Sequence, residues 1–146
     1  MVILDSDLLI SYLRNEPKAT KKLKTLVREG KRLKTTIFNV AELYLGAHLS
    51  SRKRYNLQVI TNFIKRLEII PFSITDALTY AEISANLKKK GTPIGIIDEL
   101  IASIVINQKE LLVTRNVKHF ETISVIEIEN WEEQKRKINS KRKKQG

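Results

Sequence analysis

Acidic side chains stand at the end of the first apolar segment and at the starts of two later helical segments. Asp5 closes the run Met1 to Leu4, while Glu42 and Asp98 lie near the beginnings of helical patterns. A short apolar run that turns helical at once is typical of a buried strand, which delivers its last side chain to the carboxyl edge of a parallel sheet. Ligands and metals bind at that edge in open α/β folds. Carboxylates gathered there in a strongly basic chain indicate a metal-dependent enzyme that acts on a polyanion.

Carboxylates in this arrangement suit phosphodiester hydrolysis. That reaction needs a water deprotonated near neutral pH and relief of charge on the phosphoryl oxygens, and Mg²⁺ or Mn²⁺ held by carboxylates supplies both. Without a cation, three clustered carboxylates would repel one another. Each acid alone also has a plain structural explanation, because Asp5 could cap a helix, and Glu42 and Asp98 stand in first turns that favour acids. The conjunction of all three favours a metal site.

Strands alternating with helices must position these acids. Apolar and β-branched runs predict strands at 2–5, 33–38, 68–72, 111–114 and 125–128. Helical periodicity predicts helices at 8–13, 18–30, 55–67, 76–90 and 97–106. A further helix is predicted to begin after a cap at Asn39. We expect a three-layer α/β/α domain with a central parallel sheet of four to five strands. On the helix at 18–30, Leu23, Leu26 and Val27 should face the core.

Composition limits the function classes. The 146 residues suit one domain, and 27 Lys plus Arg against 16 Asp plus Glu give a net charge of +11, so an acidic partner such as nucleic acid is expected. A merely lysine-rich protein would show the same charge. The chain has no Cys, which excludes disulfides and thiolate metal sites. No apolar run reaches transmembrane length, and we expect a cytoplasmic protein without a membrane segment.

The composition changes after Trp131. Residues 132–146 contain seven basic residues against Glu132 and Glu133, a net charge of +5. We therefore divide the chain into a folded domain at 1–131 and a basic tail at 132–146, and we expect the end of that tail to be disordered.

Five segments together carry a resemblance to a known family. They are LDSDLLI (4–10), VAELYLGA (40–47), PIGIIDELIA (93–102), LVTRNVKHF (112–120) and IENW (128–131). In this order and spacing they resemble the PIN-domain ribonucleases, most closely the VapC toxins of prokaryotic toxin–antitoxin pairs. The resemblance covers about residues 1–131.

The resemblance implies site residues. Asp5, Glu42 and Asp98 match the family's metal-binding and catalytic acids, and the implied cofactor is Mg²⁺ or Mn²⁺. Asp7 matches a position that supports the site through hydrogen bonds. Glu99 is expected to face solvent or a partner. Thr114 and Asn116 match positions that present a hydroxyl and an amide to metal or phosphate, although Asn116 could equally cap the next helix.

His119 departs from the family pattern. Many relatives have an Asp there as a fourth acid, and a histidine is a poor Mg²⁺ ligand that Mn²⁺ accepts. The number of bound metals, one or two, therefore stays open, and a surface loop residue is the alternative for His119.

Basic side chains would bind the substrate. Arg115 near the site is the best single candidate for a phosphate contact, and Arg14 begins a stretch to Lys34 with nine positive residues. Most of these should lie outside the helix at 18–30, where they could follow an RNA backbone with salt-dependent affinity. A solvated helix face explains them equally well.

The implied function is a metal-dependent endoribonuclease that cleaves structured RNA (tRNA or rRNA) as the toxin of a toxin–antitoxin pair. The family implies a homodimer, inhibited by a cognate VapB-like antitoxin. One alternative is a PIN nuclease of rRNA processing or RNA decay, which usually carries further domains. Another is a catalytically silent RNA-binding PIN module, for which only His119 speaks. The RNA that is cut and the antitoxin's identity are not encoded in any recognisable motif.

Overall fold

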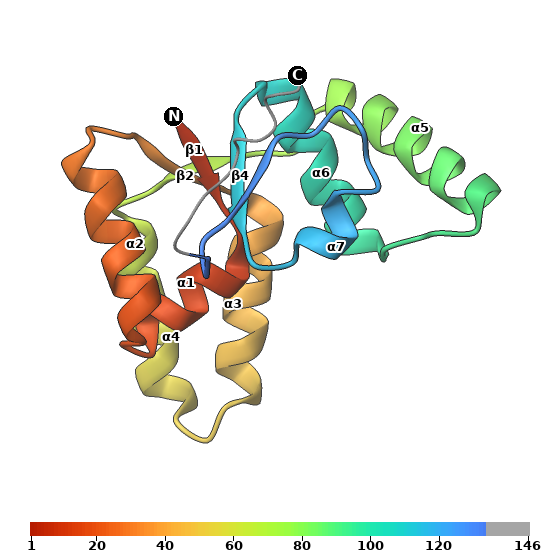
Figure 1. Cartoon of the computed structure of the whole chain (residues 1–146). Helices are drawn as coiled ribbons and strands as arrows, with labels where there is room; N and C mark the ends of the chain where they lie inside the picture. Colours follow the sequence, from red (N-terminus) through yellow and green to blue (C-terminus); the bar gives the residue numbers. More distant parts are fainter. Residues whose placement is uncertain (134–146) are drawn as a thin grey trace.

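The computed structural model describes residues 1–133, and in this part of the chain strands and helices alternate (Figure 1). The strands are β1 (Val2–Leu4), β2 (Leu33–Thr36), β3 (Glu68–Ile70), β4 (Leu111–Thr114) and β5 (Ile128–Asn130). The helices are α1 (Ser6–Leu13), α2 (Pro17–Arg28), α3 (Ile37–Leu49), α4 (Lys53–Ile64), α5 (Ile74–Lys90), α6 (Ile96–Gln108) and α7 (Val117–Phe120).

All five strands form one parallel sheet, in the order β3-β2-β1-β4-β5. The first strand is central, because Ile3 pairs with Lys34 of β2 on one side and with Leu112 of β4 on the other. The predicted α/β/α architecture with a parallel sheet is thus confirmed, with five strands in the described residues.

Successive residues of the central strands supply two separate cores. Val2 and Leu4 pack with α1, α2, α3 and α4, whereas Ile3 packs with α5, α6 and α7. This alternation follows from the two-residue period of a strand. Figure 1 accordingly shows α2 and α4 on one side of the sheet, with α5, α6 and α7 on the other.

The chain leaves β1 and β4 in opposite directions. From β1 it passes through α1 and α2 to β2, on one side of the sheet, and from β4 it passes through α7 to β5, on the other. The helices that follow these two adjacent strands therefore diverge, and a crevice opens between the carboxyl ends of β1 and β4. Such a switch in strand order is where open α/β sheets bind ligands.

Some predicted boundaries are wrong. Strand β2 ends at Thr36, which caps α3 by accepting from the amides of Phe38 and Asn39, so Asn39 lies inside the helix and is not its cap. The last strand begins at Ile128, three residues later than expected, and Val125 is exposed. Val27 on α2 is 61% exposed, since only Leu23 and Leu26 of the predicted trio reach the core.

Two further predictions from composition concern a membrane segment and the basic tail. Within residues 1–133, no helix is long and apolar enough to cross a membrane. The basic tail lies outside the described residues from 134 onward, so the division at 131 and the expected disorder stay predictions.

Candidate active site

Asp5 occupies the crevice between the carboxyl ends of β1 and β4. It follows the last residue of β1, and its backbone amide donates to the carbonyl of Val113 in β4. The residue is only 5% exposed. Its side chain also caps α1 by accepting from the amide of Ser6 at 2.8 Å. Asp5 therefore both caps α1 and lies at the carboxyl edge of the sheet, between β1 and β4.

Neutral donors from two other elements hold the Asp5 carboxylate. Thr114 Oγ1, at the end of β4, donates to Oδ2 at 2.7 Å, and Asn39 Nδ2, on α3, donates to Oδ1 at 2.9 Å. Burial, followed by the charge of nearby Asp7, raises the pKa of Asp5 to about 7, although the bonds from Thr114 and Ser6 lower it. A buried carboxylate with a pKa near neutrality would be stabilised in its charged form by a cation.

Asp7 is fixed by groups far away in the sequence. Its carboxylate accepts from the backbone amide of Arg115, at 3.2 and 3.1 Å, and from Trp131 Nε1 at 2.9 Å. Thr114 Oγ1 lies 3.2 Å from Asp7 Oδ2, but its single proton goes to the shorter contact with Asp5. Asp7 thus ties α1 to the ends of β4 and β5.

A chain of hydrogen bonds links Glu42 through Ser6 to Asn39. Its Oε1 accepts from Ser6 Oγ at 2.6 Å, and Ser6 Oγ in turn accepts from Asn39 Nδ2 at 2.8 Å. Partial burial raises the pKa of Glu42, as do the negative charges of Asp98 and Asp7, while the bond from Ser6 lowers it. The sequence argument missed the roles of Ser6 and Asn39. Asn39 precedes Glu42 by three residues on α3, a spacing that places both on one helix face and could have signalled the link.

Asp98 contacts the two polar residues at the start of α7. Its Oδ2 lies 3.1 Å from Asn116 Nδ2 and 2.8 Å from His119 Nδ1. Asn116 Nδ2 also lies 2.8 Å from His119 Nδ1. A protonated Nδ1 donates to Asp98, whereas an unprotonated Nδ1 accepts from Asn116, so the tautomer of His119 decides which of the two bonds forms. Asn116 occupies the cap position of α7 without making a side-chain cap bond, so its side chain contacts Asp98 instead of capping. His119 is half-exposed on α7 and is not a loop residue.

Glu99, next to Asp98, corrects a prediction. It was expected to face solvent or a partner, yet it is 2% exposed and accepts a hydrogen bond from the amide of Ile94 at 3.2 Å. It fastens the loop before α6 and thereby positions Asp98. The two adjacent acids consequently differ, because Asp98 lines the cavity and Glu99 is a buried structural residue.

Five acids line one open cavity of about 640 Å³, namely Asp5, Asp7, Glu42 and Asp98 together with Glu16, which follows α1. The cavity therefore collects Asp5, Glu42 and Asp98 from three elements, together with Asp7. Within residues 1–133, no three His, Cys, Asp or Glu side chains already stand close enough to hold a metal ion. Glu42 and Asp98 are instead engaged with Ser6 and His119. Chemically the donor set suits a hard divalent cation, since its oxygens are all from carboxylates.

Two basic residues stand at the same cavity. Arg14, at the end of α1, and Arg115, after β4, are both among its lining residues. The Arg115 guanidinium lies 5.6 Å from the ring centroid of Trp131 and 3.4 Å from Glu132, and its side chain is 46% exposed. In contrast, Lys34 at the end of the predicted basic stretch is buried and paired with Glu110 at 2.8 Å, so it is unavailable to a substrate.

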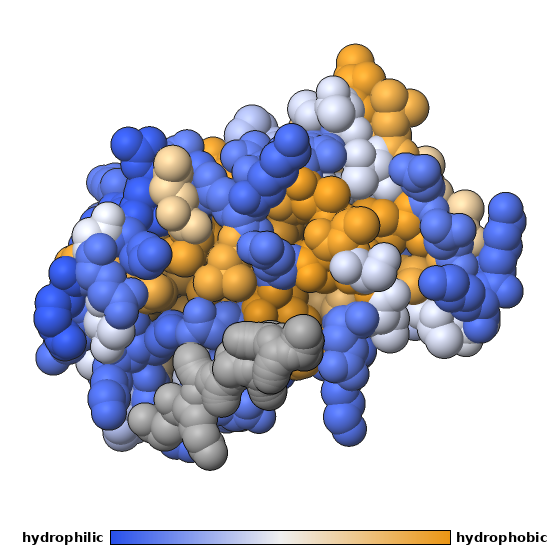
Figure 2. Space-filling view, turned by 45° about the horizontal axis from the view of Figure 1, so that its top comes forward, coloured by the Kyte–Doolittle hydropathy of each residue, from blue (hydrophilic) through white to orange (hydrophobic). Residues whose placement is uncertain are grey.

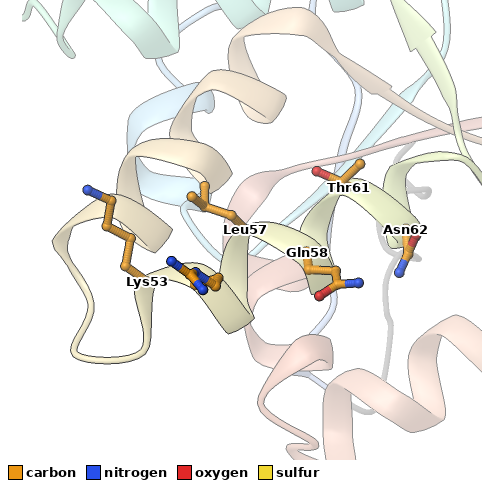
Figure 3. A pocket seen from close by; sticks show the side chains of 6 residues that line it. Lys53, Leu57, Gln58, Thr61 and Asn62 are labelled. Atoms are coloured by element: carbon orange, nitrogen blue, oxygen red, sulfur yellow. The ribbon is translucent and has the colours of Figure 1, made fainter.

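A second hollow, of about 760 Å³, lies against α4 and contains no acid. Figure 3 shows its lining side chains along that helix, among them Lys53, Gln58 and Asn62. Without a carboxylate it offers no hard-cation ligands, so its greater volume does not make it the better candidate for hydrolysis.

Comparison with known proteins decides the family. Residues 2–126 match the PIN domain family. The chain belongs to that family. It is 33% identical over 129 residues to a tRNA(fMet)-specific endonuclease VapC of Salmonella typhimurium. The matched region covers 88% of this chain and 96% of the relative. Within the PIN-domain family it is a ribonuclease toxin of the VapC type.

Solved structures of VapC-type complexes share this fold. VapBC2 from Rickettsia felis, bound to a promoter DNA fragment, matches with a TM-score of 0.82 and 32% identity over 90% of this chain and 99% of that one. VapBC-1 from nontypeable Haemophilus influenzae matches with a TM-score of 0.81 and 28% identity over 91% of this chain and 100% of that one. The PIN-like architecture thus extends over nearly the whole described chain.

Proposed function

We propose that this VapC-type PIN-domain ribonuclease is a metal-dependent endoribonuclease whose catalytic acids are Asp5, Glu42 and Asp98. The observation that carries the proposal is their convergence on one cavity at the crevice between β1 and β4. Desolvation together with mutual repulsion raises the pKa of Asp5 and of Glu42. A cation would relieve that repulsion, which is the physical reason to place one here.

Asp5, Glu42 and Asp98 would hold Mg²⁺ or Mn²⁺ through their oxygens. When bound, the cation supplies a water of lowered pKa and relief of charge on the phosphoryl oxygens. The surrounding residues orient the ligands. Thr114 and Asn39 hold Asp5.

Other contacts do the same for the remaining acids. Ser6 fixes Glu42, while Asn116 and His119 fix Asp98. Such outer contacts usually change metal affinity or activity by about 10–100-fold when removed. Asp7, Thr114, Asn116 and His119 are thus supporting residues in this proposal.

The proposed substrate is a structured RNA such as tRNA. The support is the specificity named for the Salmonella relative and the net charge of +11 of this chain. Arg14 and Arg115 flank the acids, where each could pair with a phosphate next to the one that is cleaved. RNA loops offer unstacked bases that a protein can read. Cleavage of such an RNA implies the cytoplasmic location expected from the sequence.

The proposed partners are a VapB-like antitoxin and a second copy of this chain. Relatives have been solved as VapBC toxin–antitoxin complexes. Leu45 and Leu49, on the cavity wall beside Glu42, are 59% and 78% exposed, which suits an apolar segment of a protein partner. Light scattering of the purified chain tests the homodimer, and co-expression with the antitoxin tests the complex.

Incubation of the purified chain with a tRNA pool tests the nuclease proposal. Mg²⁺ or Mn²⁺ should support cleavage, EDTA should stop it, and sequencing of the RNA ends should show a restricted set of sites. Cleavage that persists in EDTA would contradict the metal site. Tight RNA binding without cleavage under any of these conditions would favour the silent RNA-binding module.

A further inference from the structure

A basic stripe runs along the outer face of α2. Lys21, Lys24 and Arg28 are spaced by three and four residues, so they lie on one face of the helix. They line a hollow of about 490 Å³ together with Asn15, Pro17 and Thr20. We call these six residues the α2 groove. No acid is among them, and the groove therefore presents only positive charge and neutral polar groups to a ligand.

The three cations of the α2 groove are not used by the fold. All three are exposed, and within residues 1–133 none of them forms an ion pair with an acid. Their neighbour Lys22 shows the contrast, because it pairs with Glu129 of β5. Figure 2 shows a strongly hydrophilic surface on the left side of the molecule, the side of α2 in Figure 1.

The α2 groove begins where the acid cavity ends. Arg14 lines the cavity, and the next residue, Asn15, lines the groove. Asn15 has a φ of 62°, a left-handed conformation that reverses the chain between α1 and α2. Residues 14–17 alternate between the two hollows, because Arg14 and Glu16 line the cavity whereas Asn15 and Pro17 line the groove. The cavity and the groove are therefore adjacent along this turn, and Arg14 is the cavity cation next to the groove.

The dimensions fit a nucleic-acid backbone. With a helical rise of about 1.5 Å per residue, Lys21 and Arg28 are separated by about 10 Å along α2. With the spacing of B-form DNA as a guide, about 3.4 Å per phosphate along one strand, this length spans about three phosphates. We propose that the α2 groove binds the sugar–phosphate backbone of the RNA beside the cleaved phosphate. This inference rests on the proposed function and adds the path that the substrate takes.

The test compares two full-length variants with equal charge changes. One carries Lys21→Gln, Lys24→Gln and Arg28→Gln, and the control carries Lys88→Gln, Lys89→Gln and Lys90→Gln at the end of α5, across the sheet from α2. Glutamine keeps a helix propensity close to that of Lys and Arg. Binding of uncleaved tRNA is measured in EDTA, at 50 to 200 mM salt.

The slope of log affinity against log salt is negative, and the groove variant should make it shallower by about 2. Three phosphate contacts are lost, and each contributes about 0.7 on a single strand. Wild type should then lose about 15-fold more affinity than the groove variant over this salt range. The control should keep the wild-type slope, or change it by less than half as much. With metal added, the groove variant should show a raised KM and an unchanged kcat.

Equal slopes for the two variants would overturn the proposal, and so would a loss of antitoxin binding with unchanged RNA binding. Failure of the proposed function looks different, because wild type itself would then cleave no RNA. Circular dichroism of both variants confirms that α2 remains folded, and a slope that falls only in an unfolded variant counts against the groove.

Discussion

Thr114 Oγ1 donates to Asp5 Oδ2 over 2.7 Å, and this bond joins the carboxyl ends of the two neighbouring strands β1 and β4. Both residues are almost completely buried. The same hydroxyl accepts from the amide of Asn116 at 2.9 Å, so one side chain fixes an acid of the cavity and the loop that carries its neighbours. Thr114 therefore links the end of β4 both to Asp5 and to the backbone of Asn116.

Thr114→Val should reduce divalent-cation affinity by about 10–100-fold, because it removes the donor that orients Asp5 at almost constant volume. It should also cost about 1–3 kcal/mol of unfolding free energy, since Asp5 and the Asn116 amide lose a partner. Calorimetric Mn²⁺ titration and urea unfolding measure the two effects. Thr35→Val is the matched control, because buried Thr35 donates to the carbonyl of Leu4, outside the cavity. Equal Mn²⁺ affinities in the two variants would show that Thr114 acts on stability alone.

Asp98→Asn should reduce RNA cleavage by about 100-fold or more while the protein stays folded, because it removes a ligand charge without changing volume. Toxicity in a host without antitoxin should disappear as well. A helix cap would instead tolerate Asn. Initial cleavage rates and the unfolding midpoint check this, with exposed Glu121→Gln as the control on α7's C-terminal side. Full activity of a folded Asp98→Asn protein would leave Asp98 only a structural role in the first turn of α6, whose cap is Gly95.

Cation binding should strengthen as pH rises through about 7 and should release protons. The folded pKa of Asp5 is about 7, so a bound proton competes with the cation below that pH. Calorimetry at pH 6.5 in buffers of different ionisation enthalpy should report proton release of up to about one per cation, mostly lost in Asp5→Asn. Cation binding that is independent of pH would argue against Asp5 as a ligand.

The same pKa shift changes stability without metal. Between about pH 4 and 7 the folded state keeps a proton on Asp5 that the unfolded chain has already released. The contribution of Asp5 to the free energy of unfolding therefore falls as pH rises through this window and is constant outside it. Urea unfolding in EDTA at pH 5 and 7.5 should show wild type losing stability relative to Asp5→Asn. A constant difference between the two proteins would mean that Asp5 titrates alike in both states.

Truncation after Trp131 should weaken RNA binding at low salt and flatten its salt dependence, because the deleted residues carry a net charge of +5. Turnover at saturating RNA should survive, since no acid of the cavity is removed. Filter binding across a salt series measures the affinity, and initial cleavage rates at saturating RNA measure the turnover. If turnover is lost with binding intact, residues 132–146 belong to the active site or to a dimer contact, and the boundary at 131 is misplaced.

The sheet and the cavity acids were predictable because their signals are local. Short apolar strands and helical periodicity predict the alternation of strands and helices, and parallel strands bring their carboxyl ends to one edge. The strand order β3-β2-β1-β4-β5 comes from the structure alone. The outer contacts were not predictable in this way. The sequence predicts Asn39 as a cap because Asn favours that position, whereas in the structure Thr36 is both the last residue of β2 and the cap of α3. Once Asn39 is inside the helix, its amide is free to reach Asp5.

The bond between Trp131 and Asp7 also bears on how the protein is made. Trp131 Nε1 closes on α1 over a separation of 124 residues, and the central strand β1 needs β4 as its neighbour. A ribosome therefore has to release nearly the entire described chain before the acids are held in place. Incomplete translation products ending before β4 lack half of the crevice. A nascent chain that still lacks β4 and Trp131 therefore has none of the bonds that hold Asp5 to Thr114 and Asp7 to Trp131.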